Sequence, residues 1–500
     1  MSFDNTPKLS PESIDLIIGS LDAKEDLAIL KTTSLANKRL RDISQSRIFT
    51  HVDLLYLVEW KKIQLGGDQI HTQEPVVSLV DAFLNLLQTS PRIASYVRSL
   101  SFIFDTGGNP SRLSIEKGLA AAASVVALTK NLTNIWFPIT NEFRHNDSFP
   151  EWSQIPEDLR TAFLQLYQKP PSKDNERRCI NIEGIRKFPA DILLTIPRIS
   201  ELSVMPLVYE AWVEQMKNPA GITIRETYSL RSLKLYYYSQ EHTALHWVDV
   251  MKLLDLRSIG GRSAFSLNEL LDLDIVCTVD EIPEFLIMMG MHPSTMSPPL
   301  PIPYTPVIFK ACNQTLKNLT LRLPNHDSFY SSKAWGVSRV VNPPGSEVQM
   351  DLSGLSALQS LSIHFSIDQA IDEEDDYDRP LYKTHVPFVG NLLKSIVKSP
   401  AFSRSRTLSS ITFTVSLGKW CGDEGGHFPT SYNMGKVDWS DITRVLTSKF
   451  SESRLKLIKF KFLVHSGFED CSSLNEAELK TMYNTQLKKL HSSTGIVVVE

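Results

Sequence analysis

The fold of this chain can be predicted from the stretch "LRSLKL" at residues 230–235. Leu230, Leu233 and Leu235 are apolar, and alternation of apolar and polar residues is typical of a strand with one buried face. The same pattern, apolar-x-x-apolar-x-apolar, recurs at residues 49, 97, 132, 199, 270, 316, 358, 408 and 455. We call it the strand motif and number its residues 1 to 6, with apolar residues at positions 1, 4 and 6.

Helix-like stretches lie between most copies of the strand motif. They are residues 76–88, 118–131, 242–256, 387–399, 438–450 and 474–490. A final "GIVVV" at residues 495–499 reads as one more strand. Alternating strands and helices predict an α/β fold with parallel strands and right-handed crossovers.

The spacing of the copies indicates a repeated unit. Successive copies are 31 to 50 residues apart, except for one gap of 67 residues between 132 and 199. We expect that gap to contain a degenerate copy near "RRCINIEGI" (177–185). The pattern favours an irregular leucine-rich-repeat-like solenoid with insertions. The alternative is a doubly wound sheet, which usually carries a Gly-rich turn, and the chain has no GxGxxG.

Composition excludes several classes of function. The net charge of −4 gives no basic excess for nucleic acid or a membrane surface. The five cysteines form no CxxC pair, so neither a disulfide framework nor a zinc site is expected. The first residues do not resemble a signal peptide, and no apolar run is long enough to cross a bilayer. We therefore expect an intracellular protein, in the cytoplasm or nucleus or both, with no cofactor.

The N-terminal segment has a different pattern, with three short helices. Ser10 and Pro11 are favoured at a helix start, and Glu12 suits the positive end of the helix dipole. The next apolar residues, Ile14, Ile17, Ile18 and Leu21, form one stripe of an amphipathic helix. Second and third helices are expected from Leu27, Leu30 and Leu35 and from Leu40, Ile43 and Phe49. About 40 residues form a marginal core, so the stripe must pack on a further surface.

The segment resembles an F-box, most closely the form common in large fungal families. The matching residues are Leu9, Pro11, Glu12, Ile14, Ile17, Ile18, Leu21, Leu30, Ser34, Leu35, Lys38, Ile48 and Phe49. Departures from the family pattern occur at Ser10, Ser13, Thr33, Ala36 and Leu40. These substitutions weaken the apolar stripe and leave the helical spacing intact.

The resemblance implies that residues 6–49 dock the Skp adaptor, and through it a cullin, in a ubiquitin ligase. It implies adaptor contacts by Leu9, Pro11, Glu12, Ile14, Ile17, Leu21, Leu30 and Leu35. Residues 50–500 would form the repeat domain that binds a target protein. The alternative is a helical cap on a repeat scaffold for protein–protein interaction, with no ligase role.

Candidate target-binding residues follow from the strand pattern. Residues between and just after the apolar positions should line the exposed face of the parallel sheet. They are Trp136, Lys234, Tyr236, Tyr238, Arg322, His364, Lys459 and Lys461. Aromatic residues and Arg dominate binding energy at protein interfaces, so we expect a protein partner there, whose identity the pattern does not give.

Residues with catalytic potential are few, and no enzymatic activity is expected. Cys421 and His427 lie close in sequence and could form a nucleophile pair, but a Gly- and Asp-rich turn is the ordinary explanation and is preferred. Asp272 and Asp274 could hold a metal, but alternation on a strand places them on a polar face.

Overall fold

The protein is a mixed α/β molecule with parallel sheets. A computed structural model describes residues 17–18, 21, 23, 26–57, 60–65, 68–73, 79–105, 112–137, 150–168, 178–185, 187–204, 227–236, 264–276, 312–323, 340–341, 355–371, 380–384, 386, 389–390, 392–394, 407–419, 439–449, 456–464 and 497–499. The chain divides into two compact units. Unit 1 comprises Met1–Pro197 with Glu210–Trp212, and unit 2 comprises Arg198–Tyr209 with Val213–Glu500. The domain boundary predicted at residue 49 lies inside unit 1.

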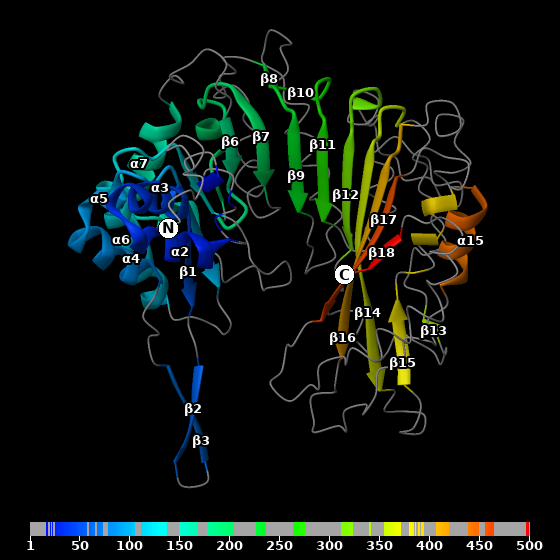
Figure 1. Cartoon of the computed structure of the whole chain (residues 1–500), viewed down its shortest axis with the longest axis horizontal. Coiled ribbons are helices and arrows are strands. Elements are labelled where there is room, and N and C mark those ends of the chain that lie inside the picture. Colours follow the sequence, from blue (N-terminus) through cyan, green and yellow to red (C-terminus); the bar gives the residue numbers. More distant parts are fainter. Residues whose placement is uncertain are drawn as a thin grey trace, which may run out of the picture. The chain divides into compact units, whose positions relative to one another are not determined.

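Unit 1 contains a small parallel sheet with helices between its strands (Figure 1). The strands of unit 1 are β1 (His51–Leu57), β2 (Trp60–Leu65), β3 (Asp68–Gln73), β4 (Ser99–Asp105), β5 (Asn134–Trp136) and β6 (Arg178–Asn181). Its helices are α2 (Leu27–Ala36), α3 (Lys38–Phe49), α4 (Leu79–Thr89), α5 (Pro91–Ala94), α6 (Arg112–Leu128), α7 (Glu157–Gln168) and α8 (Ala190–Leu193). Strands β1, β4 and β5 pair in parallel, whereas β2 and β3 form an antiparallel pair. The helices expected over 76–88 and 118–131 are confirmed by α4 and α6. Strand β6 lies in the stretch 177–185, where a degenerate copy of the strand motif was expected.

Aromatic side chains fill the core of unit 1. Phe163 of α7 lies within 6.1 Å, centroid to centroid, of the rings of Phe137, Trp152, Tyr167 and Phe188. Each of these side chains is at most 5% exposed. Tyr167 also inserts its hydroxyl into strand β5, where it accepts from Ile135 N at 3.0 Å and donates to Ile135 O at 2.9 Å.

Unit 2 is built on a long, predominantly parallel sheet whose strands follow chain order (Figure 1). They are β7 (Ile199–Val204), β9 (Ser232–Tyr236), β11 (Asp272–Val276), β12 (Asn318–Leu323), β14 (Ser360–Ile371), β16 (Ser410–Lys419), β17 (Leu457–Val464) and β18 (Val497–Val499). The second half of β14 pairs antiparallel with β15 (Pro380–Thr384), which pairs with β13 (Val340–Val341). A separate parallel pair is β8 (Tyr228–Ser229) with β10 (Phe265–Ser266). The final strand expected at 495–499 is confirmed by β18.

One face of this sheet is buried, and helix α15 (Ser440–Lys449) lies on this face beside β14 and β17. Trp439, just before the helix, is fully buried, and its ring centroid lies 6.3 Å from those of Phe365 on β14 and Phe460 on β17. Phe413 stacks on Phe460 at 4.8 Å. Positions 4 and 6 of every strand motif in β7 to β17 are at most 2% exposed. The prediction that these positions point inward is therefore confirmed.

A repeated backbone contact sets the register at the start of the strands. The N–H groups of motif positions 2 and 3 both donate to the carbonyl of position 2 in the preceding strand. In unit 1, Arg98 and Ser99 donate to Thr50, and Thr133 and Asn134 donate to Arg98, at 2.7–3.0 Å. In unit 2, Leu271 and Asp272 donate to Arg231 at 2.8 and 3.0 Å, and the contact continues through Leu271, Lys317, Gln359 and Ser409. We call this contact the shared-carbonyl ladder.

Candidate functional site: the polar face of the unit 2 sheet

The face of the unit 2 sheet opposite α15 carries polar side chains in register. Three rows cross the strands, at motif positions 3 and 5 and at the residue after position 6. The second row is Ser203, Lys234, Asp274, Thr320, Ser362, Thr412 and Lys459. The third row is Val276, Arg322, His364, Thr414 and Lys461, in which Val276 is apolar and buried. We call the three rows the polar face. The parallel register brings together residues that are far apart in the sequence.

Arg322 and Asp274 form the strongest polar contact on this face. The Arg322 guanidinium donates from Nε to Asp274 Oδ1 at 3.0 Å and from a terminal nitrogen to Oδ2 at 2.9 Å. The side chains are 28% and 22% exposed. A bidentate pair with little exposure has a fixed geometry. Arg322 is therefore held in one orientation on the polar face.

His364 lies beside Arg322 in the third row and is uncharged at neutral pH. Burial, and then the neighbouring Arg322 guanidinium, lower the pKa of His364 to about 4. Asp274 opposes this shift, and Lys461 and Lys234 make smaller contributions to it. The His364 Nε2 atom lies 3.1 Å from the Ser362 hydroxyl. An imidazole that resists protonation this strongly is a weak general base at neutral pH.

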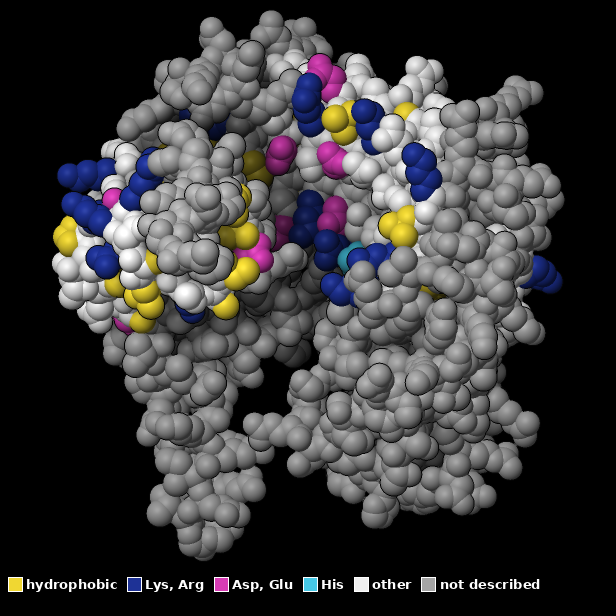
Figure 2. All heavy atoms as spheres, viewed as in Figure 1, with side chains coloured by type: hydrophobic (Ala, Val, Ile, Leu, Met, Phe, Trp, Pro, Cys, Tyr) yellow, Lys and Arg dark blue, Asp and Glu magenta, His cyan; other side chains and the backbone are white. Residues whose placement is uncertain are grey.

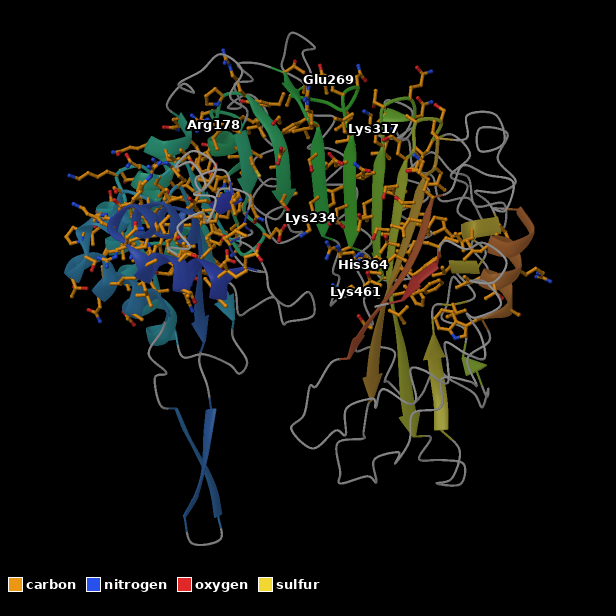
Figure 3. The ribbon with its side chains drawn as sticks, viewed as in Figure 1. Arg178, Lys234, Glu269, Lys317, His364 and Lys461 are labelled. Atoms are coloured by element: carbon orange, nitrogen blue, oxygen red, sulfur yellow. The ribbon has the colours of Figure 1, made fainter. Side chains whose placement is uncertain are left out.

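The lysines of the polar face are distributed over several strands. Figure 3 shows Lys234, His364 and Lys461 on the same side of the unit 2 sheet. Lys461 is exposed, and Lys234 and Lys459 are partly exposed. In Figure 2, Lys and Arg side chains gather over these strands beside Asp and Glu side chains. The structure therefore places Lys234, Arg322, His364, Lys459 and Lys461 on one surface, as the alternation predicted.

Three other candidate target residues do not join this group. Trp136 lies on β5 in unit 1, where it is partly exposed. Tyr236 ends β9, but its side chain and the whole of Tyr238 lie outside the described residues. Asp274 was not among the predicted binding residues, although it occupies the same motif position as Lys234 and could have been found by the same rule.

The N-terminal helical segment exposes apolar side chains. Ile17 is 50% exposed, Ile29 is 53% exposed and Leu35 is 79% exposed. Ile18 and Leu30 are buried, and Leu21 is partly exposed. The other predicted adaptor contacts, Leu9, Pro11, Glu12 and Ile14, lie outside the described residues. The helices expected around Leu30 and Leu35 and from Leu40 to Phe49 are confirmed by α2 and α3.

Helix α3 attaches this segment to the rest of unit 1. Asn37 caps the helix by accepting from Leu40 N at 2.9 Å. The ring of Phe49 stacks on that of Phe83 in α4 at 6.3 Å. Asp42 forms an ion pair with Arg92 of α5. One side of the segment is thus fixed by packing, while Ile17, Ile29 and Leu35 remain exposed.

The catalytic and metal-binding interpretations gain no support from the described residues. Asp272 accepts from the Asn318 side-chain nitrogen at 2.5 Å, and Asp274 is paired with Arg322. Within the described ranges no group of three or more His, Cys, Asp or Glu side chains is arranged to hold a metal ion. Cys421 and His427 lie outside the described residues. No helix in the described part of the chain is long and apolar enough to cross a membrane.

Comparison with known proteins gives no family for this chain. No protein-family model matches it, and no curated protein matches it. The functional interpretation therefore depends on the geometry of the two surfaces described above.

Proposed function

We propose that this protein is the substrate-recognition subunit of a Skp–cullin–F-box ubiquitin ligase. Residues 6–49 would be the F-box-like domain that docks the Skp adaptor. The following leucine-rich-repeat-like region would hold a target protein on the polar face. The proposed contacts with the adaptor are those implied by the resemblance, from Leu9 to Leu35.

The exposed apolar residues of the N-terminal segment are the observation that carries this proposal. Among the described large hydrophobic residues, four are exposed, namely Ile17, Ile29, Leu35 and Leu128. Three of these four belong to the short stretch 17–35. Covering one Leu or Ile side chain completely contributes roughly 1.5–3 kcal/mol. A partner that covers these residues would therefore gain several kcal/mol.

The buried residues of the same segment suit a docking element that is anchored to its own chain. Leu30 is fully buried, and Ile18 is 4% exposed. Phe49 packs on Phe83 at the start of the repeat-like region. The segment therefore has one packed side and one exposed side, as a receptor that joins an adaptor to a target would need.

The alternative is a repeat scaffold for protein–protein interaction in which the segment serves as a cap. The packing of Leu30 and Phe49 favours this function equally. A cap predicts that a chain lacking residues 1–48 still binds its partner but melts at a lower temperature. A ligase receptor predicts that the same deletion abolishes capture of the Skp adaptor.

Co-purification of the intact chain with the Skp adaptor tests the proposal. Ile17→Asp and Leu35→Asp place a charge at exposed positions, so the fold should persist. Each should weaken adaptor binding by about ten- to a hundredfold, because it removes one covered apolar side chain. Leu128→Asp, at an exposed position on α6, is the matched control and should bind normally. Failure of the wild-type chain to bind the adaptor, or normal binding by both segment variants, would refute the ligase role.

A further inference from the structure

We propose that the polar face of unit 2 binds an extended, carboxylate-rich segment of the partner protein. The main contacts would be made by Lys234, Arg322 and Lys461, with Lys459 beside them. This inference rests on the proposed target-binding role of the face and adds the chemical class of the partner.

The distribution of charge over the three rows supports an acidic partner. In the first row, Glu201 and Asp272 are the charged residues. The second and third rows contain Lys234, Arg322, Lys459 and Lys461 against one acid, Asp274, among the described side chains. That acid is paired with Arg322 and therefore offsets one of the four positive charges. The whole chain has a net charge of −4, so this surface has the opposite sign to the molecule. Complementary charge attracts and orients a binding partner.

The spacing of the cations favours an extended segment over a single compact anion. Lys234 on β9 and Arg322 on β12 are two strand steps apart in the sheet order, and Arg322 and Lys461 on β17 are three steps apart. With about 4.8 Å between neighbouring strands, these steps correspond to roughly 10 and 14 Å, and the two-residue offset of Lys234 along its strand lengthens the first separation to roughly 12 Å. A single phosphate would need donors that converge on one point. An extended peptide rises about 3.3 Å per residue and alternates its side chains between two faces, so carboxylates four residues (about 13 Å) apart lie on one face and match both separations.

The residues between Arg322 and Lys461 add polar groups without negative charge. His364 and Thr414 occupy the two intervening strands in the third row. Ser362 and Thr412 lie next to each other in the second row. Burial keeps His364 uncharged at neutral pH. This part of the face therefore offers neutral hydrogen-bonding groups between its cations and does not repel a carboxylate.

Peptide binding by the full-length chain tests the inference. The probe is a fluorescent ten-residue peptide with Glu at positions 2, 6 and 10 in a Gly/Ser background, so that its carboxylates lie on one side of the extended chain. The control peptide carries Gln at the same positions. Anisotropy at low salt should show binding of the Glu peptide and at least tenfold weaker binding of the Gln peptide. Added salt should weaken the binding, because the contacts are between charges at a surface.

Charge-matched variants locate the contact. Arg322→Gln and Lys461→Gln should each weaken binding of the Glu peptide about fivefold. Lys317→Gln and Lys456→Gln remove the same charge from exposed positions just before the same strands, outside the three rows, and should leave binding unchanged. Equal losses in both pairs of variants would show a general charge effect and overturn the site.

Other outcomes separate this inference from the proposed function. Equal binding of the Glu and Gln peptides would overturn the inference, as would a phosphoserine peptide that binds more than tenfold tighter than the Glu peptide. The Skp adaptor is absent from this assay. If the adaptor binds but the Glu peptide does not, the carboxylate specificity is wrong and the ligase role stands. If the peptide binds but the adaptor does not, the surface is correct and the ligase role is wrong.

Discussion

Acidification should destabilise the unit 2 sheet through His364. The pKa of this imidazole falls from 6.5 to about 4 in the folded protein, first because the ring is buried and then because Arg322 lies beside it. Between these two values the unfolded chain binds a proton that the folded chain does not. Stability therefore decreases as the pH falls through this window and is restored above it. Replacement of His364 by Gln, which stays neutral, should remove this part of the acid sensitivity.

The size of the effect follows from the shift. One pKa unit corresponds to about 1.4 kcal/mol, so a change from about pH 7.5 to about pH 5 costs at most about 2 kcal/mol. Because His364 is partly exposed, solvent screening makes this figure an upper limit. A cost of about 2 kcal/mol corresponds to at most about a thirtyfold increase in the equilibrium constant for local opening of β14.

Amide hydrogen exchange of a peptide that covers β14 measures this local stability directly. After correction for intrinsic exchange rates, the wild-type chain should lose more protection on acidification than His364→Gln. His51→Gln, at an exposed position on β1, should behave as the wild type. Equal loss in the wild type and the His364 variant, or a larger loss in the variant, would refute the assigned burial of this ring.

Three further changes test the packing. Tyr167→Phe should lower the free energy of unfolding by about 2–4 kcal/mol in urea titrations, because it leaves the buried N–H and C=O of Ile135 without their partner; a loss below about 0.5 kcal/mol would contradict this. Asn37→Ala should cost about 1 kcal/mol by removing the cap on Leu40 N, seen as a lower melting temperature; an unchanged melting temperature would show that the cap is dispensable. Phe413→Ala should cost about 3–5 kcal/mol because it leaves a cavity in a fully buried site, and chemical denaturation should resolve it; a change under 1 kcal/mol would mean that the site is not packed.

The strand positions could be predicted from the sequence because alternation is a local signal. Leu233 and Leu235 are 0% and 2% exposed, as expected for positions 4 and 6 of the strand motif. The order and direction of the strands followed from the intervening helices and the handedness of crossovers. The polar face followed from the same alternation, which placed Lys234 and Lys461 on one side.

The pairing between strands could not be predicted in the same way. Asp274 and Arg322 are 48 residues apart, and their contact depends on the register of β11 and β12. The antiparallel pairing of β14 with β15 also departs from the repeated pattern, because β14 continues to Ile371, beyond the motif. Membership of a sheet is a further property of tertiary structure, and Trp136 belongs to a different sheet from the other candidate residues.

The shared-carbonyl ladder has a consequence for how such a chain can evolve. Each strand of the ladder is aligned by the N–H groups of its motif positions 2 and 3, which donate to one carbonyl before its neighbour. The register of a strand therefore does not depend on the length of the segment that connects it to the preceding strand. Connecting segments can gain or lose residues between copies without changing the register of the next strand. For the same reason a foreign sequence could be inserted there. The uneven spacing of 31 to 67 residues between copies is the pattern that such freedom allows.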